Sequence, residues 1–293
     1  MTDGPHGAAG LLSHDWLGAC RRAAEGLEAV LRANPTSAER VVETGERGEG
    51  GDLTLVIDAA AEAAVFAELD ELHEAGARFT AVSEERGMVD YGDEDVLVVI
   101  DPIDGSLNAK RGLTHHALSV AVAEGPTMAD VVFGYVYDLG PGEEWRAVRG
   151  GGAYLNDTLL DHPMPERRRR DGKLEVVAIE SADPRWLSAS SDRLVDVTGR
   201  IRAMGSIAIS LCQVAATRVD GMATLARCRA VDAAAGQLVV RESGGIVAFT
   251  AMDEPLAAPL DLEPRSPVVA ARTPEALEQL ATLPAVQPDG ATR

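Results

Sequence analysis

The amino-acid sequence predicts an α/β fold, with an α+β N-terminal half and an α/β C-terminal half. Short runs of β-branched and other apolar residues alternate with longer segments whose apolar residues recur at helical spacing. Such alternation is typical of folds in which helices pack on sheets. At 293 residues the chain is long enough for two domains or one large domain, and an apolar fraction of 46% can supply a substantial core.

The first half begins with two predicted helices. One starts at Ser13, a favourable N-cap residue, and stops before Asn34; the other spans 59–75. Between them, residues 43–51 are polar and glycine-rich, which predicts a mobile loop. Strands are then expected over 96–100, 117–123, 130–137 and 144–149.

The second half again alternates strands with helices. Strands are expected over 174–180, 200–204, 221–225, 246–250 and 267–271. Helices are expected over 206–217, from Asp232, and from Thr273-Pro274, where Thr is the N-cap and Pro the first helical residue. The basic tetrad 167–170 lies among Pro, Glu and Asp, which favours a solvated connection. We therefore expect one half over 1–160 and a second over 170–293.

Charge and cysteine content exclude several classes of function. The chain has 47 acidic and 27 basic residues, a formal charge of −20, so it should repel nucleic acids and anionic membranes. Its 3 cysteines form no Cys-x-x-Cys, which argues against a disulfide framework or a zinc site. The first residues lack the basic n-region and apolar h-region typical of a signal peptide, and the longest apolar runs are far below the roughly 20 residues of a membrane span. We expect a soluble cytoplasmic protein. Either adaptation to salt or a base-composition bias in the coding DNA would explain the acidic, Lys-poor composition.

The most informative segment is 101–108, Asp-Pro-Ile-Asp-Gly-Ser-Leu-Asn, directly after an expected buried strand. Strand ends are where open sheets place ligand sites. Asp101 and Asp104 can bridge hard cations, while the N–H groups of Gly105 and Ser106 can hold an anion. Metal and phosphate on one loop indicate metal-assisted hydrolysis of a phosphate ester. The alternative is an ordinary turn, since Asp, Pro and Gly are common turn residues.

Three further motifs accompany this loop in a fixed order. They are the segment 52–58, the pair Glu84-Glu85 after the apolar segment 79–82, and the helical segment from Asp232 to Gly245. Together the four motifs resemble the inositol monophosphatase family, a branch of the lithium-sensitive, Mg²⁺-dependent phosphatases, over about residues 52–245. The resemblance implies a layered αβαβα sandwich of the sugar phosphatase type.

The resemblance also implies two or three Mg²⁺ ions, with Mn²⁺ as an alternative, because every ligand is an oxygen. Glu84, Asp101 and the backbone carbonyl of Ile103 would hold one ion. Asp101, Asp104 and Asp232 would hold a second, and Glu84 would also touch a third, weaker ion.

A water-orienting pair is implied by the same resemblance. Ser106 stands where the family has a catalytic Thr, and Asp58 stands where it has the paired Asp, so these two residues and Glu84 would orient and activate the attacking water. The alternative role for Asp58 is the N-cap of a helix.

Substrate contacts are implied at several places. Phosphate would be held by Asp104, Gly105 and Ser106, with Gly205 and Ser206 nearby. Where inositol-preferring members have a Glu that touches the sugar, this chain has Thr224. Arg227 and Arg229 make the segment more similar to archaeal-type members that hydrolyse both fructose 1,6-bisphosphate and inositol monophosphate. An Arg here would bind a second phosphate, or else lie on the surface.

The function that follows is hydrolysis of small phosphate monoesters, inositol monophosphate and/or fructose 1,6-bisphosphate, by a metal-activated water. The partners would be a small phosphorylated sugar or polyol and a second copy of the chain in a homodimer. A phosphoadenosine phosphate phosphatase and a catalytically inactive, metal-dependent regulatory homologue are the alternatives.

His115 and His116 should point to opposite faces of a strand, one inward and one to the surface.

Overall fold

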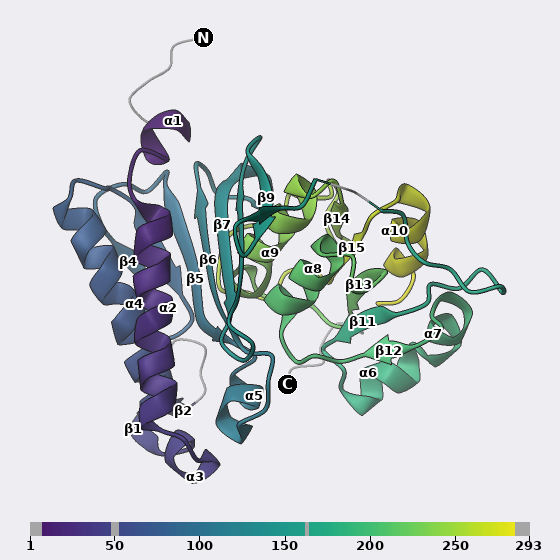
Figure 1. The fold of residues 1–293 in the computed structure, drawn as a ribbon, viewed down its shortest axis with the longest axis horizontal. Helices are drawn as coiled ribbons and strands as arrows, with labels where there is room; N and C mark the ends of the chain where they lie inside the picture. Colours follow the sequence, from purple (N-terminus) through teal and green to yellow (C-terminus); the bar gives the residue numbers. More distant parts are fainter. Residues whose placement is uncertain (1–7, 48–52, 162–163, 285–293) are drawn as a thin grey trace.

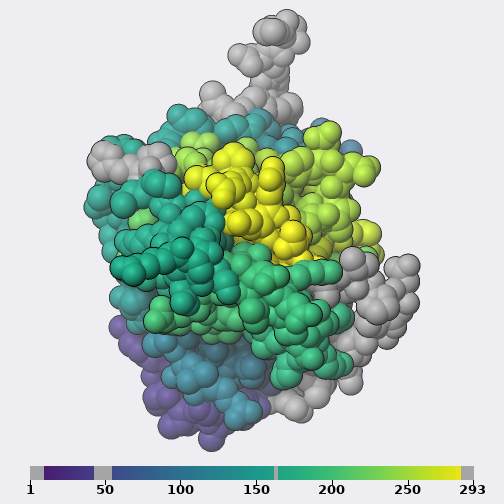
Figure 2. Space-filling model, turned by 90° about the vertical axis from the view of Figure 1, so that its right-hand side faces the viewer, coloured from purple at the N-terminus to yellow at the C-terminus, as the bar shows by residue number. Residues whose placement is uncertain are grey.

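The computed structural model describes residues 8–47, 53–161 and 164–284, which form five alternating layers of helices and sheets (Figure 1). The layers confirm the predicted α/β fold and αβαβα sandwich. The helices that build the layers are α2 (Trp16–Ala33) and α4 (Val56–Glu74) outside the first sheet, α8 (Ile207–Ala215) and α9 (Ala230–Glu242) between the sheets, and α10 (Pro274–Ala281) outside the second. Figure 2 views the outer face of the second half, with α10 at the surface in yellow.

The first sheet has eight strands, all antiparallel to their neighbours except for the parallel pair β3 and β5. In spatial order they are β10 (Thr158–Leu159), β9 (Gly152–Leu155), β8 (Glu143–Val148), β7 (Val131–Asp138), β6 (Ala117–Ala123), β5 (Leu97–Asp104), β3 (Thr80–Ser83) and β4 (Gly87–Asp90). The parallel pair matters for function, because both strands end at the same edge of the sheet.

The second sheet has five strands. In spatial order they are β12 (Ile201–Arg202), β11 (Val177–Glu180), β13 (Gly221–Thr224), β15 (Val268–Ala271) and β14 (Ile246–Phe249). β11 runs parallel to β12 and β13, whereas β15 is antiparallel to β13 and β14. The other described elements are α1 (Ala8–Leu11), α3 (Ser37–Arg40), β1 (Glu43–Arg47), β2 (Leu53–Leu55), α5 (Ser106–Arg111), the 3-10 helix Met128–Asp130, α6 (Pro184–Ala189) and α7 (Ser191–Val197).

Helix α9 fits between the two sheets because its sequence is rich in small residues. Eleven consecutive residues from Ala230 to Val240 are buried. A Cβ on Gly134 of β7 would lie 2.8 Å from the carbonyl oxygen of Ala235, so the strand and helix backbones approach as closely as glycine permits. This close packing carries the first turn of α9 toward the end of β5.

Several predicted elements begin at different residues. α2 has Asp15 as its N-cap, which accepts a hydrogen bond from Gly18, so the prediction of Ser13 is wrong. α4 begins at Val56 with Leu55 as its N-cap, which rules out the capping role considered for Asp58. α9 starts at Ala230, two residues before the expected Asp232. In α10 the expected Thr273 N-cap and Pro274 start are confirmed.

The predicted loop over 43–51 is wrong where it can be compared. Glu43–Arg47 is a strand that pairs with Leu53–Leu55, because backbone hydrogen bonds to a neighbouring strand outweigh the turn preference of a polar segment. Residues 48–51 and Asp52, the first residue of the motif at 52–58, lie outside the described residues. Short elements that the sequence analysis missed include β4, β9, α6 and α7.

Each sheet lies within one of the predicted halves, 1–160 and 170–293. The hydrophobic cluster around α8 and α9 nevertheless includes Val136 and Trp145 of the first half. A division into separate domains therefore stays a prediction. The three cysteines are buried, and none forms a disulfide. Within the described ranges, none of the helices has the length and apolar character that a bilayer crossing requires.

Gly134→Ala should destabilise the protein by about 1–3 kcal/mol, because its Cβ would meet the α9 backbone and overpack the central layers. Gly26→Ala in α2 is the control, since its Cβ would meet only the Ala64 side chain, at 3.2 Å, and alanine favours helix by about 1 kcal/mol. Urea unfolding of both variants measures the difference. Equal stability of the two variants would contradict the packing of α9 on β7.

Candidate active site

The register of two parallel strands brings the acidic motifs together. Ser83 of β3 lies opposite Ile100 of β5, so Glu84 and Asp101 follow at the same edge of the sheet. The carboxylate of Asp101 accepts a hydrogen bond from the backbone N–H of Ile103 at 2.9 Å, which fixes the loop that follows.

Asp101, Asp104 and Asp232 form a buried acidic cluster. One carboxylate oxygen of each lies within 4.8 Å of the others. The first two residues come from the end of β5 and the third from the first turn of α9. Three of the four carboxylates predicted as metal ligands are thus brought together directly.

Crowding and burial oppose the negative charge of these carboxylates. Burial raises the pKa of Asp101 well above its usual range, and the charges of Glu84, Asp104 and Asp232 raise it further. Burial and the charge of Asp232 also raise the pKa of Asp104, to about 7. A bound cation would relieve this repulsion. Carboxylate oxygens without His or Cys fit Mg²⁺ or Mn²⁺ better than zinc.

Asp104 is held by the start of α8. Its Oδ2 accepts hydrogen bonds from the Ser206 hydroxyl at 2.6 Å and from the backbone N–H of Ala208 at 2.7 Å. Ser206 is also the N-cap of α8 and is almost fully buried. Its hydroxyl thus orients a predicted metal ligand, rather than pointing into a cavity as a substrate contact would.

Arg229 lies between two predicted metal ligands. Its guanidinium is 2.5 Å from Oε1 of Glu84 and 3.1 Å from Oδ1 of Asp232. Burial opposes its charge, but Asp232 and Glu84 outweigh burial and raise the pKa of Arg229, so the side chain stays cationic. The chain therefore supplies one cation of its own to the acidic centre.

A small cavity of about 60 Å³ lies beside the cluster. It is lined by Asp58, Glu84, Glu85, Asp101, Pro102, Ile103, Ser106 and Lys110. Ser106 is the first residue of α5, and its N-cap Gly105 has a positive φ of 86°, which glycine adopts without strain. The predicted water-orienting residues Ser106 and Asp58 thus face one cavity, together with three predicted metal ligands, Glu84, Asp101 and Ile103.

A second cavity, of about 370 Å³, opens on the other side of the cluster. It is lined by Asp104, Asn108, Glu180, Ser181, Ala182, Ala203, Met204, Gly205, Ile207, Arg227, Cys228 and Asp232. Arg227 is exposed and borders this cavity. Thr224 does not border it, because its hydroxyl is buried in β13 and accepts a hydrogen bond from the N–H of Val268. We therefore do not carry Thr224 forward as a substrate contact.

The sequence model of the inositol monophosphatase family matches residues 14–286 of this chain. The chain belongs to the inositol monophosphatase family. It is 31% identical over 243 residues to the fructose-1,6-bisphosphatase/inositol-1-monophosphatase of Methanothermobacter thermautotrophicus, covering 79% of this chain and 83% of that protein. It is 33% identical over 242 residues to the Nus factor SuhB of Escherichia coli K12, covering 80% and 85%.

Solved structures of the family have the same fold. The extragenic suppressor protein suhB of Bartonella henselae aligns with a TM-score of 0.73 and 24% identity over 91% of this chain and 97% of that chain. An inositol monophosphatase-fructose 1,6 bisphosphatase aligns with a TM-score of 0.73 and 22% identity, covering 92% and 99%. The similarity extends through both sheets and the layers between them.

Two buried glutamates that the sequence analysis missed hold the loops around the candidate active site of this chain. Glu62 of α4 accepts hydrogen bonds from the Ser83 hydroxyl at 2.5 Å and from the N–H of Arg86 at 3.2 Å, and thereby fixes the turn before and after Glu84. Its position four residues after Asp58, on the same helix face, was the available signal. Glu180 accepts from the N–H of Gly205 at 2.9 Å.

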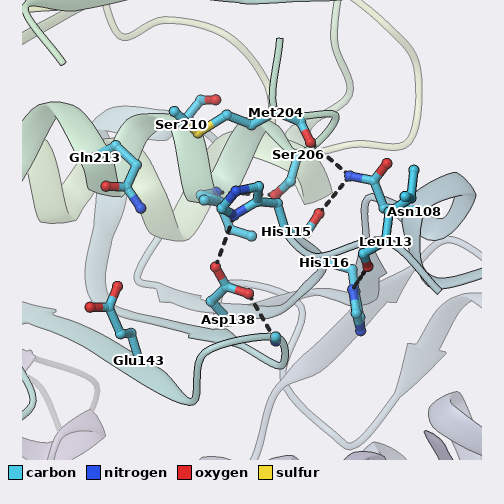
Figure 3. A network of polar contacts seen from close by, with 12 residues as sticks. Asn108, Leu113, His115, His116, Asp138, Glu143, Met204, Ser206, Ser210 and Gln213 are labelled. Atoms are coloured by element: carbon cyan, nitrogen blue, oxygen red, sulfur yellow. Dashed lines mark hydrogen bonds and ion pairs between the residues drawn. The ribbon is translucent and has the colours of Figure 1, made fainter. Parts of the chain in front are cut away.

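The loop carrying the second half's Gly205 is tied to α5. Asn108 donates hydrogen bonds to the carbonyl oxygens of His115 at 2.9 Å and Met204 at 2.7 Å (Figure 3). A Cβ on Gly105 would lie 2.8 Å from the first of these oxygens, so only glycine fits there. His116 is buried and His115 is partly exposed beside Asp138, as expected, but the predicted strand geometry is wrong: β6 begins only at Ala117, and His115 has a positive φ of 66°.

Arg229→Gln should tighten Mn²⁺ binding roughly tenfold, because a charged side chain that competes for Glu84 and Asp232 is removed; hydrogen bonds to charged groups are worth about 1.5–3 kcal/mol. Isothermal titration with Mn²⁺ measures the affinity. Arg227→Gln is the matched control, with the same change in charge but no ion pair to these carboxylates. Binding by Arg229→Gln no tighter than by the control would show that Arg229 does not compete with the metal.

Proposed function

We propose that this chain is a Mg²⁺-dependent phosphatase that hydrolyses small phosphate monoesters. The observation that carries the proposal is the buried cluster of Asp101, Asp104 and Asp232 beside the N-terminal end of α5. Membership of the inositol monophosphatase family supports it independently.

The proposed metal ligands are the predicted ones. Glu84, Asp101 and the carbonyl of Ile103 would hold one ion, and Asp101, Asp104 and Asp232 a second; Mn²⁺ suits the same oxygens. When bound, the ions would neutralise the carboxylates and supply a Lewis acid for the phosphate and the attacking water.

The chain's own groups would orient the reactants. The Ser106 hydroxyl and the Asp58 carboxylate share the small cavity with Glu84, which suits them to position a water and accept its proton. The N–H groups of Gly105 and Ser106 would hold phosphate oxygens at the start of α5, where the backbone donors lack helical partners.

The larger cavity would receive the rest of the substrate. Its volume of about 370 Å³ is within the range of small-molecule sites, and it begins at Asp104 and Asp232. Arg227 at its border would bind a second phosphate, which favours fructose 1,6-bisphosphate in addition to inositol monophosphate. The similar archaeal protein with both activities in its name supports this choice.

A regulatory role without catalysis is the second candidate, because similar proteins carry the name Nus factor SuhB. The presence of Ser106 and Asp58 with the full acidic cluster favours catalysis, since a purely regulatory protein has no need of a water-orienting pair. Inclusion of phosphoadenosine phosphate among the assay substrates tests the nucleotide alternative.

Phosphate release should require divalent metal and stop in excess chelator. Loss of a residue that only hydrogen-bonds to a metal ligand typically lowers activity roughly 10–100-fold. Asp101→Asn should lower kcat by more than this, because Asp101 itself would bridge both ions. Asp253→Asn, on the exposed surface, is the control. Full activity in chelator, or in the Asp101→Asn variant, would refute the metal assignment; no release from any substrate in Mg²⁺ would favour the regulatory role.

Arg227→Ala should raise the KM for fructose 1,6-bisphosphate roughly tenfold to a hundredfold, since a charged hydrogen bond contributes about 1.5–3 kcal/mol and about 1.4 kcal/mol corresponds to tenfold. The KM for inositol 1-phosphate, measured at the same Mg²⁺ and ionic strength, is the internal control and should change little. If both KM values rise equally, Arg227 does not read the second phosphate.

A further inference from the structure

Lys110 places an ammonium group in the proposed catalytic cavity. It lies in α5 one helical turn after Ser106, and both residues line the small cavity. Its Nζ is 3.3 Å from Oδ2 of Asp58 on α4, and both side chains are largely shielded from water, with 26% and 13% of their surface exposed. The contact joins two elements that are far apart in the sequence.

The other ionisable residues that line the cavity are acidic, and one of them, Glu84, is paired with Arg229. Lys110 is the one cationic side chain among the residues that line the cavity, which also include Glu84, Glu85 and Asp101. Glu84 repels the Asp58 carboxylate, whereas Lys110 attracts it. A partly buried ion pair is screened less than a surface pair, so Lys110 can hold Asp58 in place.

We propose that Lys110 is a positioning residue that fixes the Asp58 carboxylate in the cavity beside Ser106. The inference rests on the proposed function, because it assigns Asp58 to the orientation of the attacking water. Lys110 reaches this position because both Ser106 and Lys110 on α5 line the cavity, whereas phosphate binding would use the backbone N–H groups at the N-terminal end of the same helix.

The kinetic test is a double-mutant cycle on phosphate release from inositol 1-phosphate. Lys110→Met should lower kcat roughly tenfold to a hundredfold, the effect of losing an outer-shell partner, with KM nearly unchanged. Lys110→Arg should retain more activity than Lys110→Met. In an Asp58→Asn background, Lys110→Met should cost almost nothing further, because its partner is already lost.

Arg111→Met is the matched control. It removes one positive charge from the same helix, but Arg111 is exposed and does not line the cavity, so its kinetic constants should stay at wild-type values. A rise in KM without loss of kcat in Lys110→Met would mean that Lys110 binds the substrate instead. Full additivity with Asp58→Asn, or an equal loss in Arg111→Met, would also overturn the proposal.

An NMR measurement tests the ion pair without relying on activity. The chain has two lysines, Lys110 and Lys173, so protein labelled with ¹³C and ¹⁵N in lysine gives two side-chain signals. The signal that Lys110→Met removes should shift in Asp58→Asn, while that of Lys173 stays in place. An unmoved Lys110 signal would overturn the proposal. If Asp58→Asn shifts the Lys110 signal but the wild-type protein releases no phosphate, the ion pair is confirmed and the proposed function is refuted.

Discussion

Mutual repulsion among buried carboxylates is the constraint on which this site depends. Asp101, Asp104 and Asp232 lie within 4.8 Å of one another, away from water. The folded chain offsets part of that charge with the backbone donors at the start of α8 and with Arg229. The remaining demand for positive charge is the physical basis for proposing that the cluster binds divalent ions, in a protein whose overall charge is strongly negative.

The acidic cluster also joins the two halves of the fold. Asp104 from the first sheet accepts its hydrogen bonds from Ser206 and Ala208 of the second half, while Asp232 lies in the first turn of α9. Close packing of small residues on α9 against β7 sets how near that helix comes. Site geometry and the central core are therefore built by the same contacts, so a change in either affects the other.

Strand ends and register explain how much could be predicted. Asp101 and Asp104 follow directly from an apolar strand, and the layered fold follows from the alternation of elements and the family resemblance. The contact between Asp58 and Lys110 could not be predicted, because it joins α4 and α5, whose relative placement no sequence spacing encodes. The surroundings of Thr224 could not be predicted either, because a hydroxyl on a short strand can point to the core; here it accepts a hydrogen bond from the N–H of Val268.

The most direct test of the proposed metal site is a crystal structure from crystals soaked in Mn²⁺, with anomalous scattering recorded at the manganese absorption edge. The account predicts two manganese peaks about 4 Å apart or less, both within bonding distance of the Asp101 carboxylate, with Asp104 and Asp232 on one and Glu84 on the other. Absence of manganese from the cluster, with Arg229 still bridging Glu84 and Asp232 at saturating metal, would contradict it.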